Sequence, residues 1–302
     1  MNTLKSLLIP FSLYRKLTKP KQTFLLLYTG IFAYLISAWG YNFDIFDLFW
    51  LIVGQFLAIS GATMLNMYWD RDIDAQMERT KQRPLPMKQV IPFTVLIYGM
   101  LSVIVGILIT GLFLNFLTMV IGILGAFFNI VVYTILLKRR SRWSIVLGGI
   151  AGGLPAVGGR VAALGTLDLV SGLLLIFVLC WIPVHNLSLA LIPKTRKGYQ
   201  DAQIPVLSVE SGLSQTMRII AFSAILTAIV IIMIALLLAI HPIILLIMIV
   251  FSLYLIYLSI GNLWRPSDTK TFKIFKFASM YMGLAFLFLF IGVVINHVLQ
   301  IS

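Results

Sequence analysis

Long apolar segments alternate with short polar connections along almost the whole chain. Nine segments of about 20 residues follow one another, the length that a helix needs to cross a bilayer. Two neighbouring pairs of segments are divided only by short breaks, so a miscount of one pair stays open. The pattern predicts one domain over residues 1–302, an all-α integral membrane protein built as a bundle of nine transmembrane helices. The segments cover residues 22–40, 46–68, 91–113, 115–137, 143–163, 167–190, 217–240, 242–261 and 276–299.

Composition agrees with a lipid bilayer as the solvent of this protein. Of 302 residues, 60% are hydrophobic and 11% are charged, and the mean hydropathy is +1.02. Soluble domains carry about 25% charged residues. The longest polar connections, residues 69–90 and 191–216, have the length of loops, so no soluble domain is expected. Residues 1–21 are basic and amphipathic, which predicts an arm that lies on the inner membrane surface.

Basic residues test the helix count independently. Of the 23 lysines and arginines, 22 lie in the amino-terminal arm or after even-numbered segments. Because such residues collect on the cytoplasmic side, the amino terminus and both long loops are predicted to face the cytoplasm from the plasma membrane. The exception is Arg160, for which we expect snorkelling to the outer interface, with Asp168 as the alternative partner. Topology and anionic lipids account for the net charge of +13, and no nucleic-acid partner is expected.

Three polar residues stand at the cytoplasmic end of the second segment. Asn66, Asp70 and Asp74 are spaced four residues apart, so their side chains share one stripe of a helix. Two carboxylates and an amide make an oxygen-only site of the kind that Mg²⁺ prefers, and Mg²⁺ usually completes its coordination with substrate phosphates and water. The stripe therefore indicates a diphosphate substrate held through Mg²⁺. A solvated polar helix end is the alternative interpretation.

A longer series of motifs runs through the chain in the following order: Asp70-Arg-Asp-Ile-Asp74, Arg79-Thr-Lys-Gln-Arg83-Pro-Leu, Tyr133 with Lys138-Arg139, Trp181-Ile-Pro-Val-His185 and Ile204-Pro-Val-Leu207. It resembles the UbiA superfamily of intramembrane prenyltransferases, and its last two motifs resemble the branch of protoheme IX farnesyltransferases. The resemblance implies a UbiA-type bundle whose central cavity opens to the cytoplasm. It also implies transfer of a prenyl group, of farnesyl to geranylgeranyl length, from a prenyl diphosphate to a hydrophobic acceptor.

The resemblance also assigns roles to individual residues. Asn66, Asp70, Asp74 and Asp201 are the expected metal ligands. The expected diphosphate-binding residues are Arg79, Arg83, Lys138, Arg139 and Lys197. Tyr133 is placed to face the allylic cation, and His185 to orient an acceptor, with ordinary helix packing as the alternative for both.

The chain departs from the farnesyltransferase branch at several motif positions, which limits how far the acceptor of that branch can be assigned to this protein. Gly198-Tyr199 stands where the branch has an Asp-Tyr pair, and Val184-His185-Asn186-Leu187 replaces Pro-His-Phe-Trp. Haem B is our first choice of acceptor. An aromatic quinone precursor or an archaeal glycerol-phosphate lipid precursor stays open, as does a different class, namely a multi-helix transporter or an inactive prenyl-lipid-binding protein.

Overall fold

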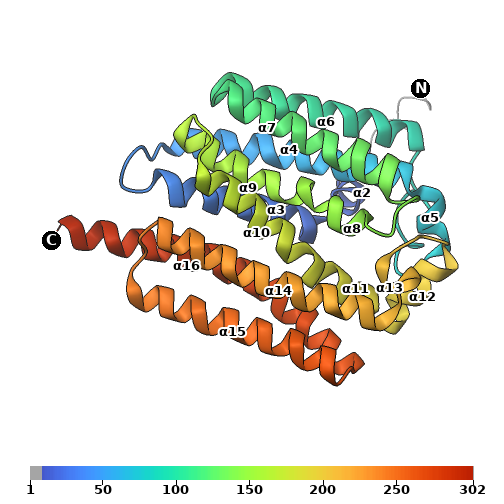
Figure 1. The fold of residues 1–302 in the computed structure, drawn as a ribbon. Coiled ribbons are helices and arrows are strands. Elements are labelled where there is room, and N and C mark those ends of the chain that lie inside the picture. Colours follow the sequence, from blue (N-terminus) through green and yellow to red (C-terminus); the bar gives the residue numbers. More distant parts are fainter. Residues whose placement is uncertain (1–8, 302) are drawn as a thin grey trace.

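The computed structural model describes residues 9–301, and all regular elements in that range are helical (Figure 1). Within those residues, eight helical segments are long and apolar enough to cross a membrane, which makes the chain a multi-pass membrane protein. They are α4 (Ile45–Trp69), α6 (Pro92–Phe113), α7 (Phe116–Phe127) with the π-helix η1 (Phe128–Leu137), α8 (Ser144–Leu147) with α9 (Gly149–Leu164), α10 (Leu169–Ile182) with η2 (Pro183–Leu187) and α11 (Ser188–Leu191), α14 (Gly212–Leu237), α15 (Pro242–Trp264) and α16 (Asp268–Ile301).

The first expected segment corresponds to α3, which spans Pro20–Ala38 and is not among those eight. The predicted arm over residues 1–21 is described only from residue 9 onward, where it forms the short helix α2 (Phe11–Leu17). The polar connections also contain short helices: α5 (Arg71–Gln76), α12 (Pro193–Asp201) and α13 (Leu207–Glu210). These three gather at one end of the bundle, on the right of Figure 1. We call this end the cap end.

Helix boundaries follow from local sequence chemistry. Proline occupies the first position of α3, α6, α12 and α15, where its missing N–H costs no hydrogen bond. Asp44 and Asn115 accept backbone N–H groups at the starts of α4 and α7. Helix α16 begins at Asp268, earlier than the expected boundary at 276, because the polar residues there continue the helix beyond its apolar part.

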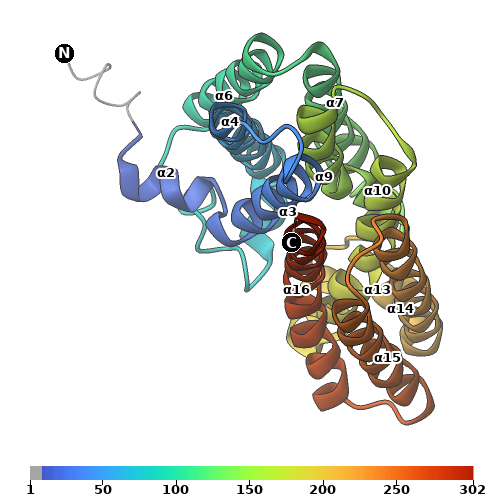
Figure 2. The ribbon, with the colours of Figure 1, turned by 90° about the vertical axis from the view of Figure 1, so that its left-hand side faces the viewer.

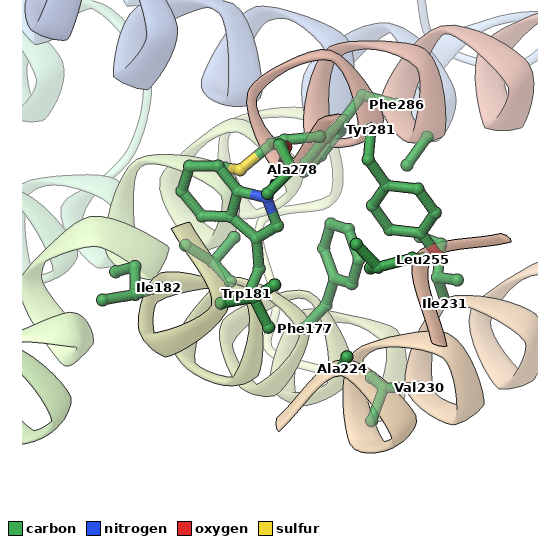
Figure 3. Close-up of a cluster of buried hydrophobic side chains, with 14 of the residues drawn as sticks. Phe177, Trp181, Ile182, Ala224, Val230, Ile231, Leu255, Ala278, Tyr281 and Phe286 are labelled. Atoms are coloured by element: carbon green, nitrogen blue, oxygen red, sulfur yellow. Dashed lines mark hydrogen bonds between the residues drawn. The ribbon is translucent and has the colours of Figure 1, made fainter. Parts of the chain in front are cut away.

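The bundle has two groups of helices, visible when it is viewed along its axis (Figure 2). Helices α3, α4, α6, α7 and α9 form one group, and α14, α15 and α16 form the other, with α10 between them. The largest buried cluster joins α10 to α14 and α16. In it, Trp181 donates its indole N–H to the carbonyl of Ala278, and Phe177 packs beside Tyr281 and Phe286 (Figure 3).

Glycine residues bring two pairs of helices unusually close together. A Cβ on Gly159 would lie 2.0 Å from the carbonyl oxygen of Gly30, and one on Gly54 would lie 2.9 Å from that of Gly106. Small residues allow such approaches between helices in lipid. Helix α9 continues through Pro155, and its glycines allow close packing, with Gly159 against α3 and Gly152 and Gly153 against α10.

Arg160 does not extend to the interface as expected. Its guanidinium binds both carboxylate oxygens of Asp168 and donates to the Ser37 hydroxyl at 3.0 Å. Arg160 is 7% exposed and is paired with Asp168, which was the alternative expectation from the sequence. We call Arg160 and Asp168 the distal ion pair, because they lie at the end of the bundle opposite the cap end.

Candidate active site

The three residues of the predicted stripe lie where α4 passes into α5. Helix α4 ends at Trp69 and α5 begins at Arg71, but the backbone bonds from Asp70 N–H to the Asn66 carbonyl and from Asp74 N–H to the Asp70 carbonyl continue across the junction. The stripe is therefore preserved. Asn66, Asp70 and Asp74 are 8%, 0% and 3% exposed, which excludes a solvated helix end.

Each of the three side chains has a basic partner from another part of the chain. The Nζ of Lys138, just after η1, donates to Oδ2 of Asp70. Arg83 donates to Oδ2 of Asp74 at 2.6 Å. Buried carboxylates are stable only when such partners compensate for their lost hydration. Arg83 and Lys138, which were expected to bind diphosphate, thus both contact the acidic stripe.

The third partner, Lys19, was missed from the sequence. Its Nζ donates to Oδ1 of Asn66 at 2.5 Å. Burial lowers the pKa of Lys19 to about 7, and repulsion from Arg83 and Lys138 adds to this effect. Lys19 also has a left-handed backbone with φ of 46°, a conformation that costs energy for a residue other than glycine. Its place directly before Pro20 was the available signal, because it puts a lysine at the start of a membrane helix.

The π-helix η1 supports this cluster from the other side. Its Thr134 accepts a hydrogen bond from Nδ2 of Asn66 at 2.9 Å and donates to the carbonyl of Asn129 at 2.7 Å. The amide of Asn66 is thereby oriented with its oxygen toward Lys19 and away from η1. Tyr133 lies close enough to interact electrostatically with Lys138 and Asp70. π-Helical turns inside α-helices are often found at functional sites.

One oxygen in the cluster has no partner. Oδ1 of Asp70 is buried and makes no hydrogen bond, although buried carboxylate oxygens are normally satisfied. The chemistry of this donor set fits Mg²⁺, because two carboxylates and an amide supply hard oxygen ligands. In the described part of the chain no three His, Cys, Asp or Glu side chains come together, so the amide of Asn66 is needed to complete a three-ligand set.

A cavity lies beside this cluster, between α3, α4, α6, α7 and α9. Thr63, one turn before Asn66 on α4, lines its upper part together with Gln22 and Asn129. Gly54 and Gln55, about three turns before Asn66 on α4, line its lower part. Most of the remaining lining is aliphatic. The arrangement joins a charged site to an apolar chamber inside the bundle.

Four residues expected at the site lie elsewhere. Arg139 forms an exposed ion pair with Asp72, whose pKa is lowered by this hydrogen bond, and also donates to the carbonyl of Trp69. Lys197 and Asp201 are on the exposed side of α12. His185 is stacked between Trp181 and Phe275, which are its neighbours in the α10–α16 core, and does not line the cavity.

The cap helix α12 presents a different basic residue. Nε of Arg196 is buried without a hydrogen-bond partner, in contrast to the exposed Lys197. Arg196 precedes Tyr199 by three residues and therefore shares its helix face. Tyr199 interacts electrostatically with Tyr133, so this face is directed toward the site. Arg79 is exposed but also interacts electrostatically with Tyr133.

Comparison with known proteins agrees with this geometry. The pattern of the UbiA prenyltransferase family matches residues 26–294. The chain belongs to this family. Accordingly it is a prenyltransferase. It is 36% identical over 281 residues to the protoheme IX farnesyltransferase of Archaeoglobus fulgidus, covering 92% of this chain and 96% of the relative. The protein of the same name from Korarchaeum cryptofilum is 37% identical over 271 residues, with 90% of each chain covered.

Solved structures of UbiA homologues share the fold. A structure from work on digeranylgeranylglyceryl phosphate synthase in membranes superposes with a TM-score of 0.77 at 19% identity, covering 97% of this chain and 99% of the other. A UbiA homologue from Archaeoglobus fulgidus bound to DMAPP and Mg²⁺ gives 0.70 at 11% identity, covering 91% and 98%. At these identities the likeness concerns the fold alone.

Proposed function

We propose that this UbiA-family prenyltransferase transfers a farnesyl group from farnesyl diphosphate to haem B, assisted by Mg²⁺. The single observation that carries this is the buried Asn66, Asp70 and Asp74 stripe, with a free oxygen on Asp70, next to an apolar cavity. The names of relatives at 36% and 37% identity support haem B as the acceptor. The likeness to the glycerol-lipid enzyme supports only the fold, because identity there is 19%.

We infer that α3 is a ninth transmembrane helix and that the cap end faces the cytoplasm from the plasma membrane. Helix α3 has 19 residues and packs against both α4 and α9 within the bundle. The lysines and arginines, apart from Arg160, support this orientation, because the inner side of a membrane collects basic residues. In this orientation the charged site lies at the cytoplasmic end of the cavity.

The ligand set for Mg²⁺ in this proposal is Asn66, Asp70 and Asp74, and Asp201 is not part of it. Bound there, Mg²⁺ supplies positive charge that stabilises the departing diphosphate. The basic partners Lys19, Arg83 and Lys138 each hold one of these ligand side chains. With a metal held by Asn66, Asp70 and Asp74, these three side chains would be placed to donate charge-assisted hydrogen bonds to diphosphate oxygens.

The remaining chemistry is the protection of an allylic cation. The aliphatic walls of the cavity exclude water from the prenyl chain, which prevents hydrolysis of the cation. Tyr133 is positioned by η1 near Lys138, at the level where the chain joins the diphosphate, and its ring stabilises positive charge there. Arg79 and Arg196 border the same region from the cap and add to its positive potential.

The test is a reconstitution with purified protein in lipid. The protein is incubated with farnesyl diphosphate, Mg²⁺ and haem B, or with an aromatic quinone precursor or a glycerol-phosphate lipid in place of haem B. Mass spectrometry measures prenylated product, and a phosphate assay measures released diphosphate. We expect farnesylated haem only with Mg²⁺ present. Product from another acceptor but not from haem contradicts the haem assignment, and absence of diphosphate release with every acceptor contradicts the enzymatic proposal.

A further inference from the structure

The lower part of the cavity ends at an unusual polar residue. Gln55 lies near the middle of α4 and is 8% exposed, at a membrane depth where polar side chains are rare and often functional. Its Nε2 donates to the carbonyl of Pro155 at 3.0 Å. Its Oε1 is buried without a partner. The amide cannot be rotated to relieve this, because the flipped form would put Oε1 against the Pro155 carbonyl oxygen.

Neighbouring glycines hold the Gln55 amide in a narrow slot. A Cβ on Gly30 would lie 2.0 Å from Oε1, and a Cβ on Gly158 would lie 3.1 Å from Nε2. The side chain therefore bridges α3, α4 and α9 and has little room to move aside. Beside it, the close approach of Gly54 to Gly106 brings α4 and α6 together. At this level of the cavity, α4 is packed tightly against α6, and the fixed side chain of Gln55 stands in the cavity wall.

The depth of the cavity can be compared with the length of a prenyl chain. Asn66 and Gln55 are 11 residues apart on one helix, which corresponds to about 16 Å at 1.5 Å per residue. An isoprene unit adds four carbon–carbon bonds to a chain, and three backbone bonds span about 3.3–3.6 Å, so each unit spans about 4–5 Å. Three units fit between the diphosphate site and Gln55, whereas a fourth reaches the amide.

We propose that Gln55 is the residue that limits the donor to about three isoprene units. The inference rests on the proposed function, since it assumes that the prenyl chain of the donor occupies this cavity. Gln55 acts in two ways: its fixed side chain fills the end of the cavity, and its free oxygen makes contact with apolar carbon unfavourable. A geranylgeranyl chain must either fold back or displace the amide from Pro155.

The chain offers two informative variants and one matched control. Gln55→Ala removes the barrier and deepens the cavity. Ala58→Leu adds bulk one turn closer to the diphosphate site, on a residue that also lines the cavity. Ser60→Ala is the control, because the Ser60 hydroxyl is likewise buried and unpartnered on α4 but does not line the cavity.

The experiment measures dissociation constants of geranyl, farnesyl and geranylgeranyl diphosphate for each purified protein in lipid with Mg²⁺, so that no acceptor is needed. We expect the wild type and Ser60→Ala to bind farnesyl diphosphate about 10-fold more tightly than the geranylgeranyl form. Gln55→Ala should abolish this ratio, and Ala58→Leu should shift the preference to geranyl diphosphate. If both variants bind farnesyl diphosphate with the wild-type preference, the inference is wrong and the proposed function stands. If the wild type binds none of the three, the proposed function fails as well.

Discussion

The two ends of the bundle both contain ion pairs with at least one buried member, but the pairs differ in how completely their hydrogen-bonding atoms are satisfied. In the distal ion pair, Arg160 and Asp168 bind each other through two hydrogen bonds. Arg160 also donates to the Ser37 hydroxyl, and Asp168 also accepts from the backbone N–H of Ser171. At the cap end, Asp70 keeps one oxygen without a partner. A fully satisfied pair needs no ligand, whereas an unsatisfied one among excess positive charge is suited to bind a cation together with an anion.

The two regions also differ in where their partners come from. Asp168 is the N-cap of α10, and its pairing with Arg160 fixes α9 against the start of that helix. The partners of Asn66, Asp70 and Asp74 are instead Lys19, Lys138 and Arg83, which come from three separate connections of the chain. Such side chains can exchange partners without moving a helix. The comparison therefore separates a structural ion pair from a ligand-exchanging one.

The largest effect is expected from the acidic stripe. Replacing Asp70 or Asp74 by Ala removes a metal ligand and should lower turnover by about 10²–10³-fold, the range seen when a group that stabilises developing charge is lost. Diphosphate release with saturating farnesyl diphosphate is the measurement. Asp72→Ala is the control, because Asp72 is two residues from each and exposed. Equal activity of Asp70→Ala and Asp72→Ala would contradict the site.

Lys19 should have the next largest effect. Its loss removes a charge-assisted contact of the kind that contributes about 1.5–3 kcal/mol, so Lys19→Ala should weaken farnesyl diphosphate binding by about 10–100-fold. Titration calorimetry with Mg²⁺ present measures this. Lys21→Ala is the matched control, since Lys21 is exposed and two residues away. If both variants bind like the wild type, Lys19 only anchors the start of α3.

A smaller effect is expected one contact further from the metal. Thr134→Val keeps the shape of the side chain but removes the hydroxyl that accepts from Nδ2 of Asn66. Loss of a group that orients a metal ligand typically weakens metal binding by about 10-fold or more. For Thr134→Val we expect a loss at the lower end of that range. Thr134→Ser should restore affinity. Titration of Mn²⁺ in the presence of farnesyl diphosphate detects the change, and an unaltered affinity in Thr134→Val would mean that Asn66 is oriented by other contacts.

The distal ion pair should affect binding least. Arg160→Ala removes a largely buried guanidinium together with its bonds to Ser37 and to the exposed Asp168, so the thermal unfolding midpoint should fall by several degrees while farnesyl diphosphate binding stays unchanged. Arg218→Ala, at an exposed arginine, is the control for stability. A loss of substrate binding in Arg160→Ala at a temperature where it is folded would show that the two ends are coupled.

Because of the distal ion pair, we also expect the stability of the protein to depend on pH. Hydrogen bonds from Arg160 hold the pKa of Asp168 well below its usual range. A depressed carboxyl pKa stabilises the fold above the unfolded pKa of about 4, and the contribution is lost as the pH falls toward the folded value. The difference in unfolding midpoint between wild type and Arg160→Ala should therefore shrink below pH 4.

The sequence by itself determined the membrane class, the long helices and the acidic stripe. These features rest on local rules: apolar runs of sufficient length must become helices in lipid, and residues four apart must share a helix face. These rules did not assign Arg83 and Lys138; that assignment came from the resemblance to the UbiA family, because Lys138 is 64 residues beyond Asp74 in the chain. Local rules could not decide which of the other basic residues bind substrate, since a lysine at a helix end can contact either lipid headgroups or a substrate.

Only the tertiary structure decided which side chains meet. Lys19 and Asn66 are far apart in sequence and touch because α3 packs on α4, and Arg196 rather than Lys197 turns inward because α12 presents one face to the site. In the sequence, Gln55 is simply one polar residue in an apolar segment. Only the structure shows that α3, α4 and α9 meet around its side chain. Contacts of this kind depend on the relative placement of helices, which side-chain packing fixes and which no local periodicity encodes.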